Sequence, residues 1–217
     1  MKKSRKNNFK RKSYLVFKKF MDISFAFLSL IIISPLFLLI VILIKFSSMG
    51  PIFFLHKRIR KGKNKFYCIK FRTMHPESKD ILKNILSKND SLRLEYESTQ
   101  KIKNDPRITT IGKFLRKTSL DEIPQFINVI KGEMSIVGPR PIIKEEEIRY
   151  GDSISNVFSI DPGITGLWQV SGRNNLTYEK RVELDNLYVE EINFLTDLRI
   201  IIRTIGVIFF PMDRGAY

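Results

Sequence analysis

The 217-residue chain has very few of the residues that build disulfides, metal centres and many hydrolytic sites. Its single cysteine, Cys68, cannot form an intramolecular disulfide, and it cannot by itself build a cysteine-rich metal site. Only two histidines are present, His56 and His75. This scarcity argues against most zinc hydrolases and against a Ser-His-Asp triad.

Acidic side chains are almost absent from the first third of the chain. Residues 1–72 contain 18 Lys and Arg but a single acid, Asp22, whereas residues 73–217 contain 20 basic and 21 acidic residues. The net charge of +16 therefore comes entirely from the first third. Such a localised positive charge indicates an anionic partner, either nucleic acid, an anionic bilayer or a phosphate-bearing substrate. Solubility alone is the less informative alternative.

A long apolar run lies in the same basic third. The 22 residues from Ile23 to Ile44 carry no charge, and as a helix they would measure about 33 Å, enough to cross a hydrocarbon core of about 30 Å. A buried core helix is one alternative, but the run is apolar on all sides. A secretory signal is another, but the run is too long and no small-residue cleavage site follows it. We therefore expect membrane contact.

The charges on both flanks of this run bear on its topology. Lys18 and Lys19 precede it and a basic stretch that begins at Lys45 follows it, so the positive-inside tendency favours the cytoplasmic side for both ends. Ser34-Pro35 lies near the middle, where proline removes a helical hydrogen bond and clashes with the preceding turn. These features predict a re-entrant helical hairpin, with a kinked but complete crossing as the alternative.

The remaining pattern predicts an α+β, mostly helical fold with a domain on the bilayer surface. We expect a basic arm over 1–13, the re-entrant membrane helix over 14–48 and this domain, with C-terminal interfacial helices, over 49–217. The resemblance described below implies that it is a cytoplasmic catalytic domain. The predicted strands and helices follow from alternation, periodicity and turn residues. They are strands at Ile52–Leu55 and Phe66–Phe71, helices near 78–88, Leu120–Ile130, 142–150 and Tyr178–Phe210, and a glycine-rich loop at Pro162–Gly172.

Adjacent carboxylates at Asp121 and Glu122 are the first candidate for chemistry. The structural alternative is strong, because Ser119 followed by Glu122 before an apolar run has the spacing of a capping box. In favour of function, a basic stretch directly precedes them, and carboxylates among cations could hold a metal and a phosphate together.

Three further segments could contact anionic groups. Lys70 and Arg72 lie at the end of a predicted strand, where cations can clamp phosphate. Arg140 lies between two prolines that stiffen its loop, which suits bidentate phosphate binding. Trp168 lies in the glycine-rich segment and could stack on a base, although a lone tryptophan is more often part of a core. An ordinary basic surface or a structural salt bridge is the alternative for the cations.

Together these segments resemble the bacterial sugar transferase family, the monotopic phosphoglycosyl transferases, over residues 14–205. The pieces that carry the resemblance are specific in their order and spacing rather than singly. They are Lys19-Phe20-Met21-Asp22 with Ser34-Pro35, Gly50 to Phe54, Lys70 to Met74, Asp105 to Thr109, Leu115 to Gln125, Lys131 to Ser135, Val137 to Pro141, Pro162 to Arg173, and Leu184-Asp185.

The resemblance implies a helix that re-enters the membrane at Ser34-Pro35 and an Asp-Glu dyad. Asp121 would attack the sugar-bearing phosphorus of a UDP-sugar, release UMP and hold the phospho-sugar until polyprenyl (undecaprenyl) phosphate displaces it. Mg²⁺ is expected, with Asp121 or Glu122 near it. Further family positions implied in substrate and phosphate binding are Lys70, Arg72, Arg116, Arg140 and Asp197.

The expected setting is the cytoplasmic face of a bacterial inner membrane, where such enzymes initiate surface-glycan synthesis. The partners are then a UDP-sugar, with galactose or glucose favoured, polyprenyl phosphate and anionic membrane lipid, while a homodimer stays open and no nucleic acid is expected. The alternative is a membrane-tethered basic protein that binds nucleic acid or acts as a scaffold. Against nucleic acid, the chain contains no helix-turn-helix, RNA-recognition or zinc-finger pattern.

Overall fold

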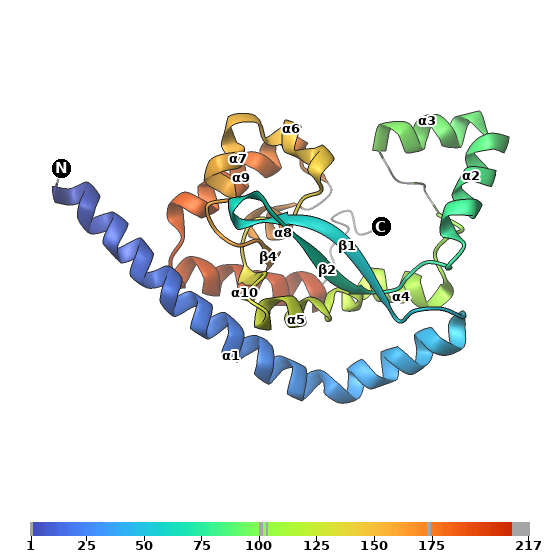
Figure 1. Cartoon of the computed structure of the whole chain (residues 1–217), viewed down its shortest axis with the longest axis horizontal. Helices are drawn as coiled ribbons and strands as arrows, with labels where there is room; N and C mark the ends of the chain where they lie inside the picture. Colours follow the sequence, from blue (N-terminus) through green and yellow to red (C-terminus); the bar gives the residue numbers. More distant parts are fainter. Residues whose placement is uncertain (1, 100–101, 103, 173–174, 210–217) are drawn as a thin grey trace. The chain divides into compact units, whose positions relative to one another are not determined.

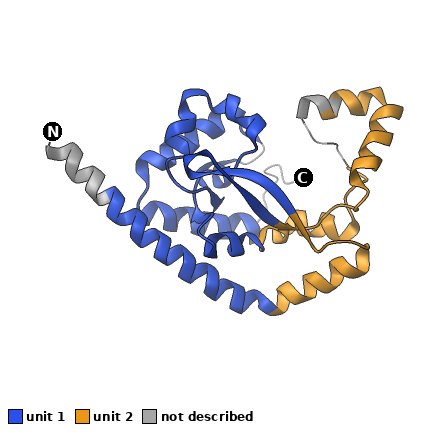
Figure 2. Cartoon of the chain, viewed as in Figure 1, with its two compact units in different colours: residues 1–34, 55–69, 124–216 blue, residues 35–54, 70–123, 217 orange. Residues whose placement is uncertain are grey.

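The computed structural model describes residues 2–99, 102, 104–172 and 175–209 (Figure 1). These described residues are mostly helical and form two small sheets of two strands each, which confirms the predicted mixture. It divides into two compact units (Figure 2). Unit 1 comprises residues 1–34, 55–69 and 124–216, and unit 2 comprises residues 35–54, 70–123 and 217.

The predicted membrane element lies in one long helix, α1 (Lys2–Ser47). Its stretch Arg11–Ser47 has a mean hydropathy of 3.1 in its most apolar part and is the helix, among the described residues, long and apolar enough to cross a membrane. The helix continues through Pro35, and Ser34 Oγ donates to the carbonyl of Ile31 at 2.8 Å. Two separate helical arms are therefore not confirmed, and the re-entrant path remains a prediction.

Unit 1 is built around a short parallel sheet and the helices that follow it. Strands β3 (Ser135–Val137) and β4 (Gly163–Thr165) pair in register from Ser135 opposite Gly163 to Val137 opposite Thr165. Its core includes Val129, Tyr188 and Val189, which are at most 1% exposed. The other elements after residue 124 are α5 (Gln125–Ile130), η3 (Lys144–Glu146), α6 (Glu147–Tyr150), η4 (Gly151–Ser153), α7 (Ile154–Val157), α8 (Leu167–Ser171), α9 (Tyr178–Glu191) and α10 (Phe194–Phe209).

The described residues of unit 2 include the last part of α1 and the helices α2 (Ser78–Lys88), α3 (Asp90–Thr99) and α4 (Thr110–Thr118), followed by the single turn η2 (Leu120–Glu122). The rings of Phe37, Phe53 and Phe71 form an aromatic cluster with centroids 4.9 to 6.1 Å apart. A side chain at Gly112 would lie 2.0 Å from the Thr73 carbonyl, so this position of α4 accepts only glycine.

The two predicted strands and several predicted helices are confirmed, with longer or shorter bounds. Strand β1 (Phe53–Arg60) pairs with β2 (Asn64–Phe71) across the turn η1 (Lys61–Lys63). The helix expected over 78–88 is α2. The region from Tyr178 forms α9 and α10, and its predicted end at Phe210 lies outside the described residues, as does Arg173.

Two local predictions are wrong. The helix expected over Leu120–Ile130 is interrupted before Gln125, because Pro124 separates η2 from α5. The segment Pro162–Gly172 is not a continuous loop, since it contains β4 and α8. A side chain on Gly163 would lie 2.1 Å from the backbone nitrogen of Gly138. Glycine at 163 therefore permits close strand packing.

Candidate active site

The predicted dyad lies directly after α4, in unit 2. Thr109 caps the start of this helix, where its Oγ1 accepts from the Gly112 N–H at 2.9 Å. The helix ends at Ser119, which adopts a left-handed conformation with φ 58°. Ser119 makes no side-chain capping bond to the following turn. The capping-box explanation of Glu122 is therefore wrong, and the two carboxylates need another account.

Lys70 supplies part of that account. Its Nζ donates to Glu122 Oε1 at 2.5 Å and lies 4.0 Å from Asp121 Oδ2. The three side chains remain partly exposed, at 22% for Lys70, 14% for Asp121 and 25% for Glu122. One ammonium thus faces both carboxylates in a place that solvent can still reach.

Burial raises the pKa of Asp121 to about 6, with the neighbouring charge of Glu122 acting in the same direction. The positive charges of Lys70 and Arg116 oppose this rise. At neutral pH the carboxylate is therefore mostly ionised, while a partly desolvated carboxylate is more reactive than one in water. This combination suits a nucleophile that must attack phosphorus near pH 7.

Arg116 is held beside the dyad by Thr73. Its Nε donates to Thr73 Oγ1 at 2.9 Å, and burial lowers the pKa of this guanidinium. Thr73 in turn accepts the Thr109 N–H with its carbonyl at 3.0 Å. The sequence analysis did not single out Thr73 as a site residue, although it lies inside the Lys70–Met74 segment that carried the resemblance.

Arg107 and Asp105 form a buried ion pair in the segment that precedes α4. Arg107 Nη2 lies 2.6 Å from Asp105 Oδ2, and Nε lies 2.9 Å from Oδ1 and 3.0 Å from Oδ2. Burial acts to raise the pKa of Asp105, but the hydrogen bonds and charge of Arg107 lower it overall. The Arg107 guanidinium also lies 5.6 Å from the centre of the Tyr96 ring, so both partners are held by protein groups and we assign the pair to support rather than to chemistry.

Arg72 is placed differently from the phosphate clamp that the resemblance implies. Its guanidinium donates to the Met49 and Ser48 carbonyls at 2.8 and 2.7 Å and to Ser48 Oγ at 3.0 Å. These bonds hold the chain just beyond the C-terminus of α1. In this arrangement Arg72 anchors backbone, and a phosphate contact by this residue stays a prediction.

Arg140 and Asp197 belong to unit 1, and each has its own surroundings there. The guanidinium of Arg140 lies 5.8 Å from the centre of the Trp168 ring. Asp185 accepts the Tyr150 hydroxyl at 3.0 Å, and burial raises its pKa to about 8, against the opposing effects of Tyr150 and Arg140. Arg140 thus lies in a polar, aromatic-lined environment.

Asp197 is buried in a closed hydrogen-bond network. It accepts from Lys18 Nζ at 2.5 Å, from the Tyr14 hydroxyl at 2.6 Å and from the Tyr188 hydroxyl at 2.7 Å. Both carboxylate oxygens are therefore occupied by protein donors. The network joins α1 to α9 and α10 within unit 1. The carboxylate of Asp197 therefore has a structural role in this network.

The described residues contain no group of three or more His, Cys, Asp or Glu side chains that could hold a metal ion on their own. Mg²⁺, however, is usually bound by one or two carboxylates together with substrate phosphates. The adjacent oxygens of Asp121 and Glu122 match that donor set.

The chain is similar in sequence to known proteins over most of its length. The family model described as "Bacterial sugar transferase" matches residues 13–211. An exopolysaccharide production protein ExoY of Sinorhizobium fredii is 44% identical over 200 residues, which cover 92% of this chain and 88% of that protein. An undecaprenyl-phosphate galactose phosphotransferase of Salmonella typhimurium is 42% identical over 211 residues, covering 97% of this chain.

A UDP-glucose:undecaprenyl-phosphate glucose-1-phosphate transferase of Escherichia coli is 38% identical over 208 residues, covering 92% of this chain. The chain matches only 44% of the length of the Salmonella protein and 41% of the Escherichia protein. In both, the similarity is confined to a part of about the size of this chain.

Proposed function

The chain belongs to the bacterial sugar transferase family, and we propose that it transfers a sugar-1-phosphate from a UDP-sugar to polyprenyl phosphate, with undecaprenyl phosphate as the acceptor. The observation that carries the proposal is the ammonium of Lys70 facing both Asp121 and Glu122. The names of the relatives support hexose substrates and a role at the start of exopolysaccharide or capsule synthesis. Galactose and glucose are therefore the donors to test first.

In the first step a carboxylate oxygen of Asp121 attacks the sugar-bearing phosphorus of the donor. A phosphorus–oxygen bond forms to Asp121, and the anhydride bond to the inner phosphate breaks, so that UMP leaves with the bonding electrons. In the second step an oxygen of polyprenyl phosphate attacks the same phosphorus, and the bond to Asp121 breaks. The carboxylate is regenerated and the product is a polyprenyl diphosphate sugar.

The cations around Asp121 support this chemistry electrostatically. Lys70 and Arg116 would offset the negative charge that accumulates on the diphosphate as the anhydride bond breaks. Glu122 holds the ammonium of Lys70 and so orients it toward Asp121. Mg²⁺, held by Asp121 and Glu122 together with substrate phosphates, would neutralise further charge on the leaving group.

We place this reaction at the cytoplasmic face of the inner membrane, with α1 as the anchor. The apolar stretch of α1 and the basic residues on both of its flanks support a re-entrant path. Labelling of introduced cysteines tests it, because native Cys68 is buried. Lys12→Cys and Lys57→Cys should both react from the cytoplasmic side, and labelling from opposite sides would establish a full crossing instead.

The function itself is tested by product formation with the full chain in detergent or nanodiscs. UDP-galactose and UDP-glucose are supplied with and without undecaprenyl phosphate, and both UMP and the lipid product are measured. We expect UMP release to depend on the donor and on Mg²⁺, and multiple turnovers to depend on the lipid acceptor. No UMP from any hexose, hexosamine or deoxysugar donor in the presence of acceptor would contradict the proposal.

A further inference from the structure

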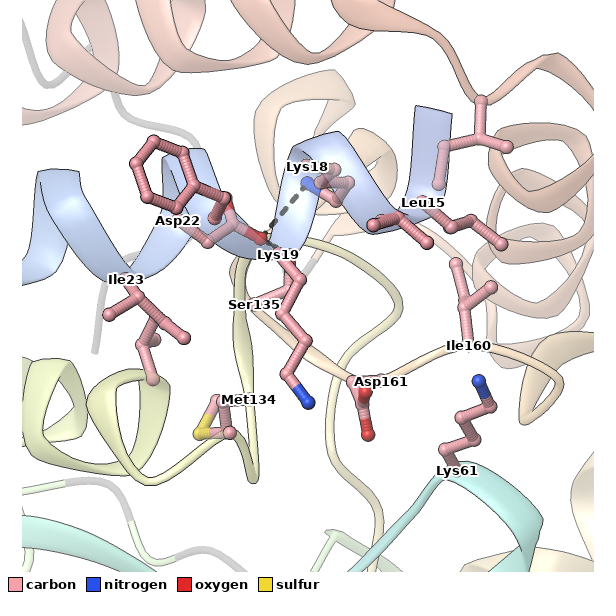
Figure 3. Close-up of a pocket in the computed structure, with 15 residues that line it drawn as sticks. Leu15, Lys18, Lys19, Asp22, Ile23, Lys61, Met134, Ser135, Ile160 and Asp161 are labelled. Atoms are coloured by element: carbon pink, nitrogen blue, oxygen red, sulfur yellow. Dashed lines mark hydrogen bonds and ion pairs between the residues drawn. The ribbon is translucent and has the colours of Figure 1, made fainter. Parts of the chain in front are cut away.

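A cavity of about 470 Å³ lies within unit 1, between the first half of α1 and the loops around β3 and β4 (Figure 3). This volume is within the range of pockets that bind small ligands. Most of its lining is apolar and includes Leu15, Val16, Phe20, Ile23 and Ile160. The proposed transfer chemistry uses none of these residues.

Three charged side chains meet at this cavity without forming a closed network. Lys19 comes from α1, Lys61 from η1, and Asp161 from the loop before β4, and the two ammonium groups lie on either side of the Asp161 carboxylate in Figure 3. Within the described chain, neither lysine has a carboxylate at ion-pair distance. Lys18, the third lysine of the lining, differs because it is paired with Asp22 and Asp197.

Asp161 is the second, independent sign of a ligand. Its Oδ1 is buried and has no hydrogen-bond partner among the described residues. A buried acceptor without a partner is costly and calls for an explanation, such as a donor supplied from outside the chain. The cavity therefore offers two donors for an anion and one acceptor for a cation or hydroxyl.

The position of the cavity indicates where such a ligand would come from. Val16 and Phe20, which line the cavity from α1, are 75% and 71% exposed. The uncharged run begins at Ile23, so the cavity meets α1 just before its apolar part. A basic, half-apolar stretch of this kind lies at the level of lipid headgroups.

We propose that this cavity binds the phosphoethanolamine headgroup of a membrane phospholipid. The phosphate would accept from the ammonium groups of Lys19 and Lys61, and the ethanolamine ammonium would donate to the carboxylate of Asp161. The acyl chains would leave the cavity past Val16 and Phe20 into the bilayer. This inference rests on the proposed membrane setting but not on the transfer reaction.

Native mass spectrometry of the full chain in detergent tests it with lipids of identical acyl chains. Phosphatidylethanolamine and phosphatidylcholine share the phosphate and the net charge, but only the former carries N–H donors. We expect the ethanolamine lipid to bind about tenfold more tightly than the choline lipid, which is the effect of one charge-assisted hydrogen bond. Equal binding of the two lipids would overturn the proposal.

Variants separate the two halves of the site. Asp161→Asn should abolish the preference for ethanolamine over choline and leave the affinity for phosphatidylglycerol undiminished. Lys61→Ala should weaken all three phospholipids about tenfold. Lys65→Ala is the matched control, because it removes an exposed charge nearby that does not line the cavity. Equal losses with Lys61→Ala and Lys65→Ala would show non-specific attraction and overturn the site.

Soluble glycerophosphoethanolamine distinguishes a lipid from a free metabolite. It should bind far more weakly than the lipid, and equal affinity would overturn the membrane source. UMP release by the same preparations tests the transfer reaction separately. Normal UMP release with no lipid discrimination would remove this site alone, whereas lipid discrimination without UMP release would remove the transfer proposal alone.

Discussion

Two lysine-carboxylate clusters in this molecule use the same chemical groups with different outcomes. In unit 1, Lys18 and Asp197 are 8% and 9% exposed, and the hydroxyls of Tyr14 and Tyr188 also donate to the carboxylate. In unit 2, Lys70 and Glu122 are 22% and 25% exposed. Asp121 lies beside them, with its Oδ2 4.0 Å from the same ammonium group. The first cluster is closed and the second is open.

This difference teaches how to separate a structural ion pair from a reactive one. A buried pair tolerates desolvation only when hydrogen bonds satisfy its remaining atoms, and such a pair leaves no room for a substrate. An open pair keeps positive charge accessible for phosphate and holds a carboxylate with a raised pKa. We therefore predict that Asp197 contributes to stability and that Asp121 takes part in the chemistry.

The largest expected effect is the loss of the reacting oxygen in the open cluster. Asp121→Asn should lower UMP release by at least about a thousandfold, because the amide cannot form the covalent intermediate. Intact-mass analysis of the wild type with donor alone should show a phospho-sugar adduct, mapped by peptide analysis to Asp121. Asp90→Asn, in the exposed first turn of α3, is the control and should keep full activity. An adduct on another residue would contradict the assignment.

The closed cluster should respond in stability. Asp197→Asn removes the ion pair that Lys18 forms with Asp197 and leaves the ammonium of Lys18 buried. We expect this to lower the free energy of unfolding by about 3 kcal/mol. Urea unfolding followed by the fluorescence of Trp168, the only tryptophan, reports this for unit 1. Glu183→Gln breaks the exposed pair with Lys180 and should cost less than about 1 kcal/mol.

Activity per folded molecule distinguishes a structural role of Asp197 from a role in the reaction. Asp197→Asn should retain turnover once the folded fraction is taken into account. A large fall in turnover with unchanged stability would instead make Asp197 part of the reaction, as the family resemblance implies.

The smallest effect is a shift in pH dependence. In the proposed mechanism Asp121 reacts as the carboxylate, so activity should fall as the pH drops through about 6, the pKa of that group. Lys70 lowers this pKa, so Lys70→Met should raise it by about one unit and move the acid limb to higher pH. Rate profiles from pH 5 to 8 measure the shift. Lys117→Met, an exposed lysine of α4, should leave the limb in place, and a shift equal to that of Lys70→Met would argue for a general charge effect.

Much of the site could be predicted from the sequence because its parts are local. Asp121 and Glu122 are adjacent, the apolar run is continuous, and β1 and β2 are joined by a short turn, so neighbouring residues determine each of them. The predicted capping box is wrong because Ser119 ends the preceding helix α4 in a left-handed conformation. In this conformation its backbone N–H donates to the carbonyls of Arg116 and Leu115 in α4. The prediction of a loop for the glycine-rich segment is wrong because Gly163 lies in a strand that packs closely against Gly138, which is distant in the sequence.

By itself the sequence determined the anchor, the family and the pair of acids, since composition and order are enough for these. Only the tertiary structure decided which charges are free to act. It surrounded the Lys18–Asp197 pair with two tyrosines, turned Arg72 toward backbone carbonyls and brought Lys70 to the dyad. It also left Asp161 Oδ1 without a donor among the described residues. The physical reason is that the energy of a charge depends on its burial and its partners, and residues distant in sequence supply both.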